Sequence, residues 1–189
     1  MRLKTIGATV LMGALLAMTA TVSGQATGET FTATATVRGA GGASATAPVI
    51  ITIDRKMAQP EADRIAAAFR TGGEDALRKA LVGVAPTGTI KIGGGEVTPT
   101  RVTIERVIDG GRLLTIVADK PLVFIGAGAP GAQPKAGYTF AVVDLEVKAD
   151  GTGTGNIAPA AKLKMNQNAF VVDDYGAEAV RLTAVKKTR

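Results

Sequence analysis

Polar and apolar residues alternate strictly in the stretch that begins at Glu29. Threonines at every second position are interleaved with Phe31, Ala33, Ala35 and Val37. A period of two with one polar face is typical of a half-exposed β-strand. The β-branched run at residues 47–53 follows across a Gly/Ala/Ser stretch, so we expect these two segments to form a hairpin.

A helical period replaces this alternation over about residues 59–84. Pro60 suits the first turn of a helix, and Gly72 is typical of a residue that ends one. A second amphipathic stretch follows directly, so the sequence predicts two short helices that must dock on a sheet to persist. The expected buried stripes are Ala62, Ile65 and Phe69 in the first helix and Leu77, Ala80, Leu81 and Val84 in the second.

Beyond Pro86 every strong pattern indicates β-structure. The predicted strands are residues 89–92, 100–108, 112–118, 122–125, 138–148, 155–164, 170–172 and 180–185. Asp109-Gly110-Gly111 and Asp150-Gly151 have the composition of tight hairpin turns, which predicts an antiparallel meander. Residues 113–117 and 122–125 are apolar on both faces, so we expect a cover on each side: the helices on one and a second layer of sheet on the other.

These elements predict one fold class and one domain. We expect an α+β, mainly-β domain over residues 27–189, built as an antiparallel sandwich or a partly open barrel, with the two-helix insert after the second strand. Removing 26 of the 189 residues leaves 163, a length that suits one domain with its own core.

The first 26 residues have the pattern of a cleaved secretory signal peptide. Arg2 and Lys4 precede an uncharged, apolar run over residues 5–20, which is shorter than the ~20 residues needed to span a bilayer. Small residues at Gly24 and Ala26 suit cleavage before Thr27, and Val22 and Gly24 would also suit cleavage before Gln25. We therefore expect a bacterial periplasmic or secreted protein with no membrane span after cleavage.

Charge and composition limit the classes of molecule that this protein is expected to bind. The signal segment holds two of the 22 basic residues and none of the 16 acidic ones, which leaves a net charge of +4. The basic residues are scattered and Trp is absent, so we expect no nucleic-acid binding. A protein partner or an envelope component remains as the expected ligand, and the sequence leaves the oligomeric state open.

The absence of Cys and His excludes several chemistries. Without them there is no disulfide, thiol nucleophile, imidazole base or His-based metal site. Ser44 is the single serine beyond the signal segment, and no S-x-x-K pattern surrounds it. We expect neither a cofactor nor a metal, and any catalysis would depend on carboxylate, Lys, Tyr or Thr side chains.

Two glycine-rich segments resemble nucleotide-binding loops only superficially. Residues 126–131 match G-x-G-x-x-G, but Pro130 and Pro134 leave no room for the helix that this motif requires. Residues 151–156 lack the Lys and the following helix of a phosphate-binding loop. We interpret the first as a connecting loop that could border a ligand site and the second as a hairpin turn.

The most chemically suggestive residues are Asp144, Glu146 and Lys148. They alternate with apolar residues in one predicted strand, so their side chains would share one face. The two carboxylates would stand about 6–7 Å apart, near the spacing of glycosidase acid/base pairs, and the Lys could keep one ionised. The same alternation is also what a solvated strand face looks like.

Three functions stay open on the sequence. The leading hypothesis is an exported non-catalytic domain that binds a partner or an envelope component. The alternatives are a carboxylate-dependent hydrolase that uses Asp144 and Glu146, and a carrier of a small apolar ligand. A hydrolase needs both carboxylates in a cleft with a raised carboxyl pKa, a carrier needs an enclosed apolar cavity, and a binding domain needs neither.

Overall fold

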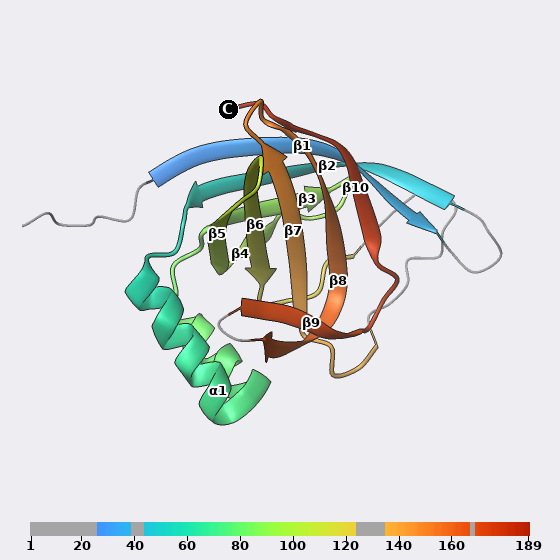
Figure 1. Ribbon diagram of the computed structural model, residues 1–189. Helices are drawn as coiled ribbons and strands as arrows, with labels where there is room; N and C mark the ends of the chain where they lie inside the picture. The colour runs from blue at the N-terminus through green and yellow to red at the C-terminus, as the bar shows by residue number, and fades with distance from the viewer. Residues whose placement is uncertain (1–25, 39–43, 124–134, 167–168) are drawn as a thin grey trace, which may run out of the picture.

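The computed structural model describes residues 26–38, 44–123, 135–166 and 169–189 (Figure 1). All but the last residue of the predicted signal peptide, and the whole glycine motif at residues 126–131, lie outside these residues. The described elements are β1 (Ala26–Arg38), β2 (Ser44–Arg55), α1 (Gln59–Val82), β3 (Gly88–Ile92), β4 (Thr98–Thr100), β5 (Val102–Ile108), β6 (Gly111–Ala118), β7 (Phe140–Lys148), β8 (Thr152–Asn166), β9 (Ala169–Tyr175) and β10 (Val180–Lys187).

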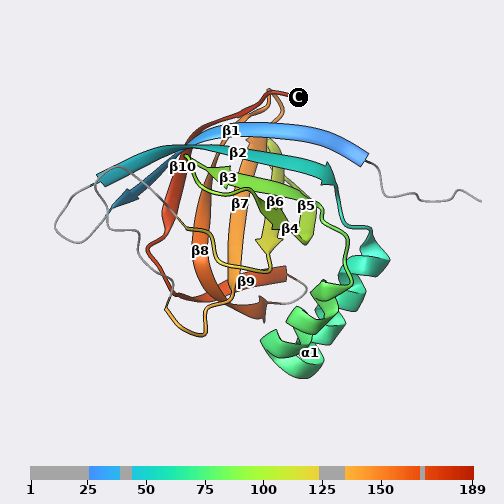
Figure 2. The same ribbon diagram turned by 180° about the vertical axis from the view of Figure 1, so that it is seen from behind.

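The strands form one antiparallel sheet of ten strands that curls into a nearly closed barrel (Figures 1 and 2). Its order is β4-β3-β2-β1-β10-β8-β7-β6-β5, and β9 pairs with β8 off this path. The two ends of the order, β4 and β5, are separated in the chain by Arg101 alone. The amide of Met57, just after β2, donates to the carbonyl of Thr103 on β5 at 2.9 Å. These links bring the ends of the sheet together and confirm the prediction of a mainly-β, partly open barrel.

The barrel interior holds the larger hydrophobic core. Side chains from seven strands fill it, and the largest of them are almost fully buried: Phe31, Ile51, Ile53, Ile90, Leu114, Ile116, Leu145 and Ile157. We call the face that carries these side chains the inner face. Burial of this apolar surface is the main force that curls the sheet.

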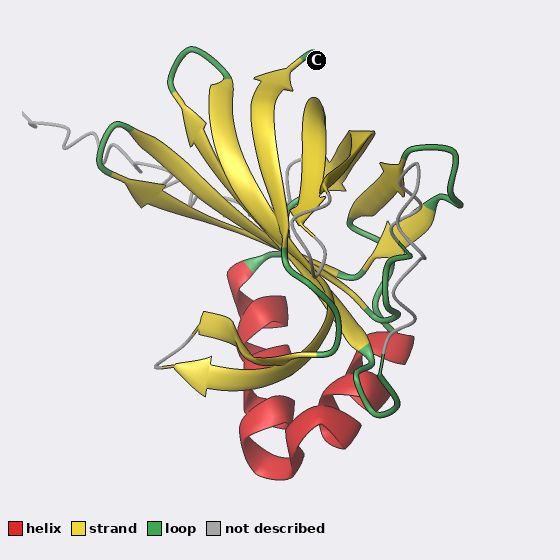
Figure 3. Ribbon diagram, turned by 90° about the vertical axis from the view of Figure 1, so that its right-hand side faces the viewer, coloured by secondary structure: helices red, strands yellow, loops and turns green. Residues whose placement is uncertain are grey.

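A second core lies between the outer face of the barrel and α1 (Figure 3). On β6 and β7, Val117 and Val142 point to this outer core, whereas their neighbours Ile116 and Val143 point inward. Phe69 of α1 meets Phe170 of β9 edge to face, with ring centroids 5.8 Å apart. For β6, the two covers predicted from residues 113–117 are therefore present, with the inner core on one face and the outer core beneath α1 on the other.

The prediction of two separate helices is wrong, because a single α1 spans the insert. Gly72 and Gly73 lie inside it with non-helical backbone angles, and Gly73 has a φ of 62°. The helix continues directly after this kink, without linker residues. Among the residues described, no helix is both long enough and apolar enough to cross a membrane.

Two strand predictions also differ from the structure. Leu122 and Val123 form no strand; the amide of Leu122 donates to the carbonyl of Pro159 at 2.8 Å and its side chain enters the inner core. The other two residues of that run lie outside the described part. The predicted strand 100–108 is divided at Arg101, because the chain there passes from one end of the sheet to the other. The amide of Arg101 donates to the carbonyl of Val117 at 2.8 Å.

The predicted hairpins are confirmed. β1 pairs with β2 along most of its length. Asp109 and Gly110 form a two-residue turn between paired Ile108 and Gly111, and Gly110 has a φ of 74° that Gly adopts without strain. Gly151 has a φ of 80° in the next hairpin.

Candidate functional site

The structure places Asp144, Glu146 and Lys148 on β7 with their side chains on the outer face. The intervening Leu145 and Val147 belong to the inner core, so the three polar side chains point the other way. Asp144 is half-buried, whereas Glu146 and Lys148 are exposed. The common face expected from the sequence is therefore present, but the three residues differ in environment.

Asp144 is the most perturbed carboxyl of this face. Burial raises its pKa, and the neighbouring charge of Glu146 adds to the rise. A 2.7 Å hydrogen bond donated by Thr115 and the charge of Arg106 lower the pKa in part. Asp144 therefore holds a proton more readily than an exposed aspartate.

An open pocket of about 660 Å³ lies beside this face, at the rim formed by the hairpin turns. Its lining, which defines what we call the rim pocket, is Ile108, Asp109, Gly110, Gly111, Glu146, Val147, Lys148, Thr152, Gly153, Thr154, Ala184, Val185 and Lys186. Glu146 and Lys148 line the rim pocket, but Asp144 does not. Of the two neighbouring carboxylates that the sequence grouped as a candidate catalytic pair, Glu146 therefore lines the pocket and Asp144 lies beside it on the same face of β7.

Strand register explains how distant segments build the rim pocket. At the rim, Ile108 pairs with Gly111 and Gly111 with Lys148, while Thr152 pairs with Lys186. The pair Val147–Gly153 links these two groups across β7 and β8, one residue further in. The next row inward holds Glu146 opposite Thr154. On Thr152, both the amide and the hydroxyl donate to Oδ1 of Asp150, at 2.8 and 2.7 Å, which fixes the turn at the pocket edge.

A β-bulge in β10 forms one wall of the rim pocket. Leu182 pairs with Gly155 and Val185 pairs with Gly153, so the two residues between them on β10 face Thr154 alone. One of these two is Ala184, the described non-glycine residue with a positive φ, 50°. This conformation is strained for a side chain with a Cβ. Sequence reasoning missed the bulge because no Gly marks it.

Gly153 on the facing strand permits close contact between strands. A Cβ at this position would collide with the carbonyl oxygen of Glu146. The glycine-rich run at 151–156 is a hairpin turn at its start, as interpreted from the sequence, and continues as strand β8. The glycines of this run that lie within β8 therefore allow β7 and β8 to approach closely beside the pocket.

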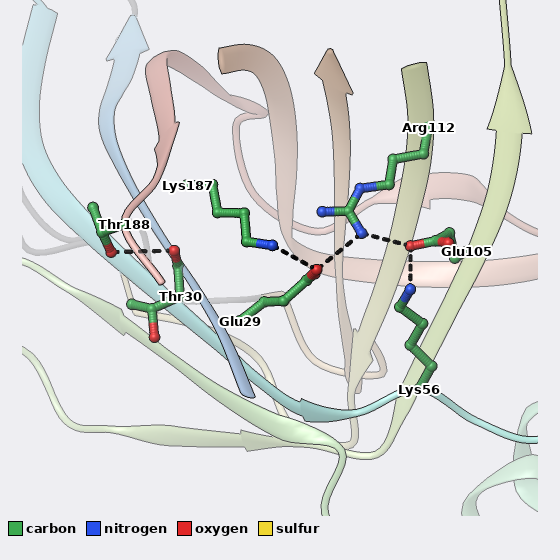
Figure 4. Close-up of polar contacts among 7 residues, drawn as sticks. All are labelled: Glu29, Thr30, Lys56, Glu105, Arg112, Lys187 and Thr188. Carbon is green, nitrogen blue, oxygen red and sulfur yellow. Dashed lines mark hydrogen bonds and ion pairs between the residues drawn. The ribbon is translucent and has the colours of Figure 1, made fainter. Parts of the chain in front are cut away.

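A second polar feature lies on the inner face, at the same end of the barrel (Figure 4). We call it the charged cluster: Glu29, Lys56, Glu105, Arg112 and Lys187. Oε1 of Glu29 accepts from Arg112 at 3.1 Å and from Lys187 at 3.0 Å. Glu105 contacts Arg112 at 2.8 Å and Lys56 at 2.6 Å. These pairs connect β1, β5, β6, β10 and the segment after β2 across the barrel.

Packing and backbone pairing hold the charged cluster in place. The guanidinium of Arg112 lies over the ring of Phe31, 5.9 Å from its centroid, and closes the inner core. The Thr188 hydroxyl donates to the carbonyl of Thr30 at 3.2 Å, which keeps the end of β10 beside β1 and brings Lys187 to Glu29 (Figure 4). The cluster therefore caps the core at this end.

The two acids of the charged cluster are held ionised. Burial by itself would raise the pKa of Glu29, but hydrogen bonds and charge from Lys187 and Arg112 outweigh it and leave the pKa lowered. The pKa of Glu105 is lowered in the same way by Lys56 and Arg112. Oε2 of Glu29 is buried and has no hydrogen-bond partner among the described residues.

Sequence reasoning missed the charged cluster because its members come from five distant segments. A signal was nevertheless present. Glu29 is two residues before buried Phe31, and Arg112 is two residues before buried Leu114. Each charged side chain therefore lies on the same strand face as a core residue. A charge on the apolar face of a strand requires a partner, which predicts such a cluster without naming its members.

Neither a metal site nor a comparison with known proteins assigns a function to these residues. Within the residues that the structure describes, no three acidic, His or Cys side chains gather so that they could hold a metal ion. Comparison with known proteins finds that no family model, no curated protein and no solved structure matches this chain.

Proposed function

We propose that this chain is an exported, non-catalytic binding domain that takes up a protein partner or an envelope component at the rim pocket. The pocket volume of about 660 Å³ falls in the range of about 300–1,000 Å³ that is usual for ligand sites. Tight turns and paired strands form its walls, so the site is preorganised on rigid elements.

The observation that carries this proposal is the strained Ala184 in the pocket wall. Left-handed conformations of non-glycine residues cost free energy and cluster at sites where function maintains them. The described part of the chain contains one such residue, and it lines the rim pocket. A bulge of this kind also redirects side chains out of the regular strand pattern.

The packed interior gives the carrier hypothesis no support. Inner-face side chains such as Phe31, Leu114 and Ile157 are fully buried against their neighbours. A carrier of apolar ligands would instead need interior side chains that line an open volume.

A carboxylate-dependent hydrolase is the second candidate, because burial raises the pKa of Asp144 as a general acid requires. Its weakness is that Asp144 lies outside the rim pocket while Glu146 lies in it. If purified protein hydrolyses an envelope polymer, Asp144→Asn and Glu146→Gln should each abolish that activity. A domain that only binds would show no turnover to abolish.

Blocking the rim pocket tests the binding function. Thr154 is exposed and lines the pocket, so Thr154→Arg should fill it and lower co-sedimentation of the mature protein with its own purified envelope fraction by at least about tenfold. Thr46→Arg is the matched control, because Thr46 is an exposed strand residue that does not line the pocket. Equal retention of both variants would contradict the proposal.

A further inference from the structure

Four charged side chains around the rim pocket lack partners. Asp109, Glu146, Lys148 and Lys186 line it, and none forms an ion pair or a hydrogen bond with another residue that the structure describes. The nearby charged cluster differs, because each of its five members is paired. The pocket therefore presents two positive and two negative groups that make no direct ion pair among the described residues, although the charge of Asp150 acts on Lys148 and that of Asp144 acts on Glu146.

These charges are arranged in rows. Lys186 pairs with Thr152, and Lys148 is next to Val147, whose partner Gly153 is next to Thr152. The Cα atoms of Lys148 and Lys186 are therefore about 10 Å apart, across two strand spacings. Glu146 is two residues further along β7 on the same face, about 7 Å from Lys148. An anionic group would fit between the lysines, and a cationic group would fit over Glu146.

We propose that the rim pocket binds a zwitterion of the short-peptide class. Its carboxylate would lie between Lys148 and Lys186, and its ammonium group would lie over Glu146. This inference rests on the proposed function and names the ligand class for the same site. A purely anionic ligand would be repelled by Glu146 and Asp109, whereas a zwitterion satisfies both signs.

The length of the site selects a short peptide over a single amino acid. An extended dipeptide spans about 7 Å, which matches the separation of the two rows. The other lining residues supply small aliphatic contacts at Ala184 and Ile108 and hydroxyl groups at Thr152 and Thr154. None of the described lining residues is aromatic, so small side chains such as alanine fit better than stacking groups.

Dialanine and its two blocked forms test this inference. Titration of the isotope-labelled mature protein should move the amide resonances of Gly110, Gly153 and Lys186 with millimolar affinity, as expected for exposed ion pairs. N-acetyl-dialanine lacks the ammonium group and dialanine amide lacks the carboxylate, so each should bind about three- to fivefold more weakly.

Charge variants assign each end of the ligand. Glu146→Gln should weaken dialanine by about three- to fivefold but bind N-acetyl-dialanine as well as or better than the unaltered protein, because it removes a like charge. Lys148→Gln should weaken dialanine in the same way but bind the cationic amide as well as or better than the unaltered protein. Asp54→Asn and Lys91→Gln are the matched controls, since both residues are exposed and lie outside the pocket lining. These controls should bind dialanine like the unaltered protein.

The outcomes separate this inference from the proposed function. Equal binding of all three peptides, or no resonance shift at about 20 mM dialanine, would overturn the zwitterion assignment. Loss of envelope binding in Thr154→Arg would then still support the binding function. If Thr154→Arg keeps full envelope binding, the proposed function fails even if dialanine binds.

Discussion

Ala184 combines an unfavourable backbone conformation with a place in the pocket wall. Its φ of 50° is one that Gly adopts freely and Ala does not. We expect Ala184→Gly to raise the free energy of unfolding by about 0.5–1 kcal/mol, because relief of strain exceeds the added freedom of the unfolded chain. Urea denaturation measures this change.

The control for that substitution is Ala33→Gly, in the regular part of β1. Ala33 has no positive φ and its side chain is buried, so Gly there should lower the free energy of unfolding by about 1 kcal/mol. A loss of stability in both variants would show that the Ala184 backbone is not strained.

At the residue scale, the sequence was informative where a period alone decides the outcome. The shared face of Asp144, Glu146 and Lys148 follows from a period of two and is present in the structure. The burial of Asp144 and its contact with Thr115 could not be predicted, because they depend on the neighbouring strand. The bulge at Ala184 lacked the Gly that usually marks one.

The kink of α1 allows an element-scale prediction from two glycines. A Cβ at Gly73 would meet no atom within 4 Å, yet φ there is 62° and ψ is −152°, a region open essentially to Gly alone. Gly73→Ala should therefore lower the free energy of unfolding by about 1–3 kcal/mol through the backbone alone. Thermal and urea unfolding measure the loss.

Gly83, at the end of the same helix, is the matched position. It also has open space around the added Cβ, but its φ is −87°, which Ala tolerates. Gly83→Ala should be neutral or raise the free energy of unfolding by about 0.4–1 kcal/mol. Similar destabilisation by both substitutions would mean that the kink at Gly73 is not maintained in solution.

Elements were predictable where hydrophobic periodicity was long and regular. The hairpin β1/β2 and strands β6, β7 and β10 follow from alternation and turn residues. Two kinds of error arose from tertiary structure. α1 continues past Gly72 because both halves pack on the same outer core, and Leu122 fills the inner core from a loop instead of a strand.

At the scale of the whole molecule, the charged cluster connects segments that lie on opposite sides of the barrel. The sequence could not show that Glu29 meets Arg112, because the two residues are brought together only when the sheet curls. We expect Glu29→Gln to lower the free energy of unfolding at pH 7 by about 2 kcal/mol. This is less than a fully buried ion pair would lose, because Lys187 is partly exposed.

The same cluster predicts a pH dependence. The pKa values of Glu29 and Glu105 are lowered in the folded state, so their stabilising effect is present above the ordinary value of 4.5 and is lost as the pH falls through the lower folded pKa. Unfolding free energy should therefore drop below about pH 4.5, and less steeply in Glu29→Gln. Asp173→Asn breaks an exposed pair with Lys164 and should keep the full acid dependence.

We propose that the rim pocket is the binding surface of this domain. The most direct test is to map amide resonances of the isotope-labelled mature protein while a solubilised extract of its own envelope is added. We predict changes confined to the turn at Gly110, the strand at Gly153 and the bulge at Ala184, with none at the exposed Val82 of α1 or Val97. Changes centred on α1 or β9, with the rim pocket unaffected, would contradict the account.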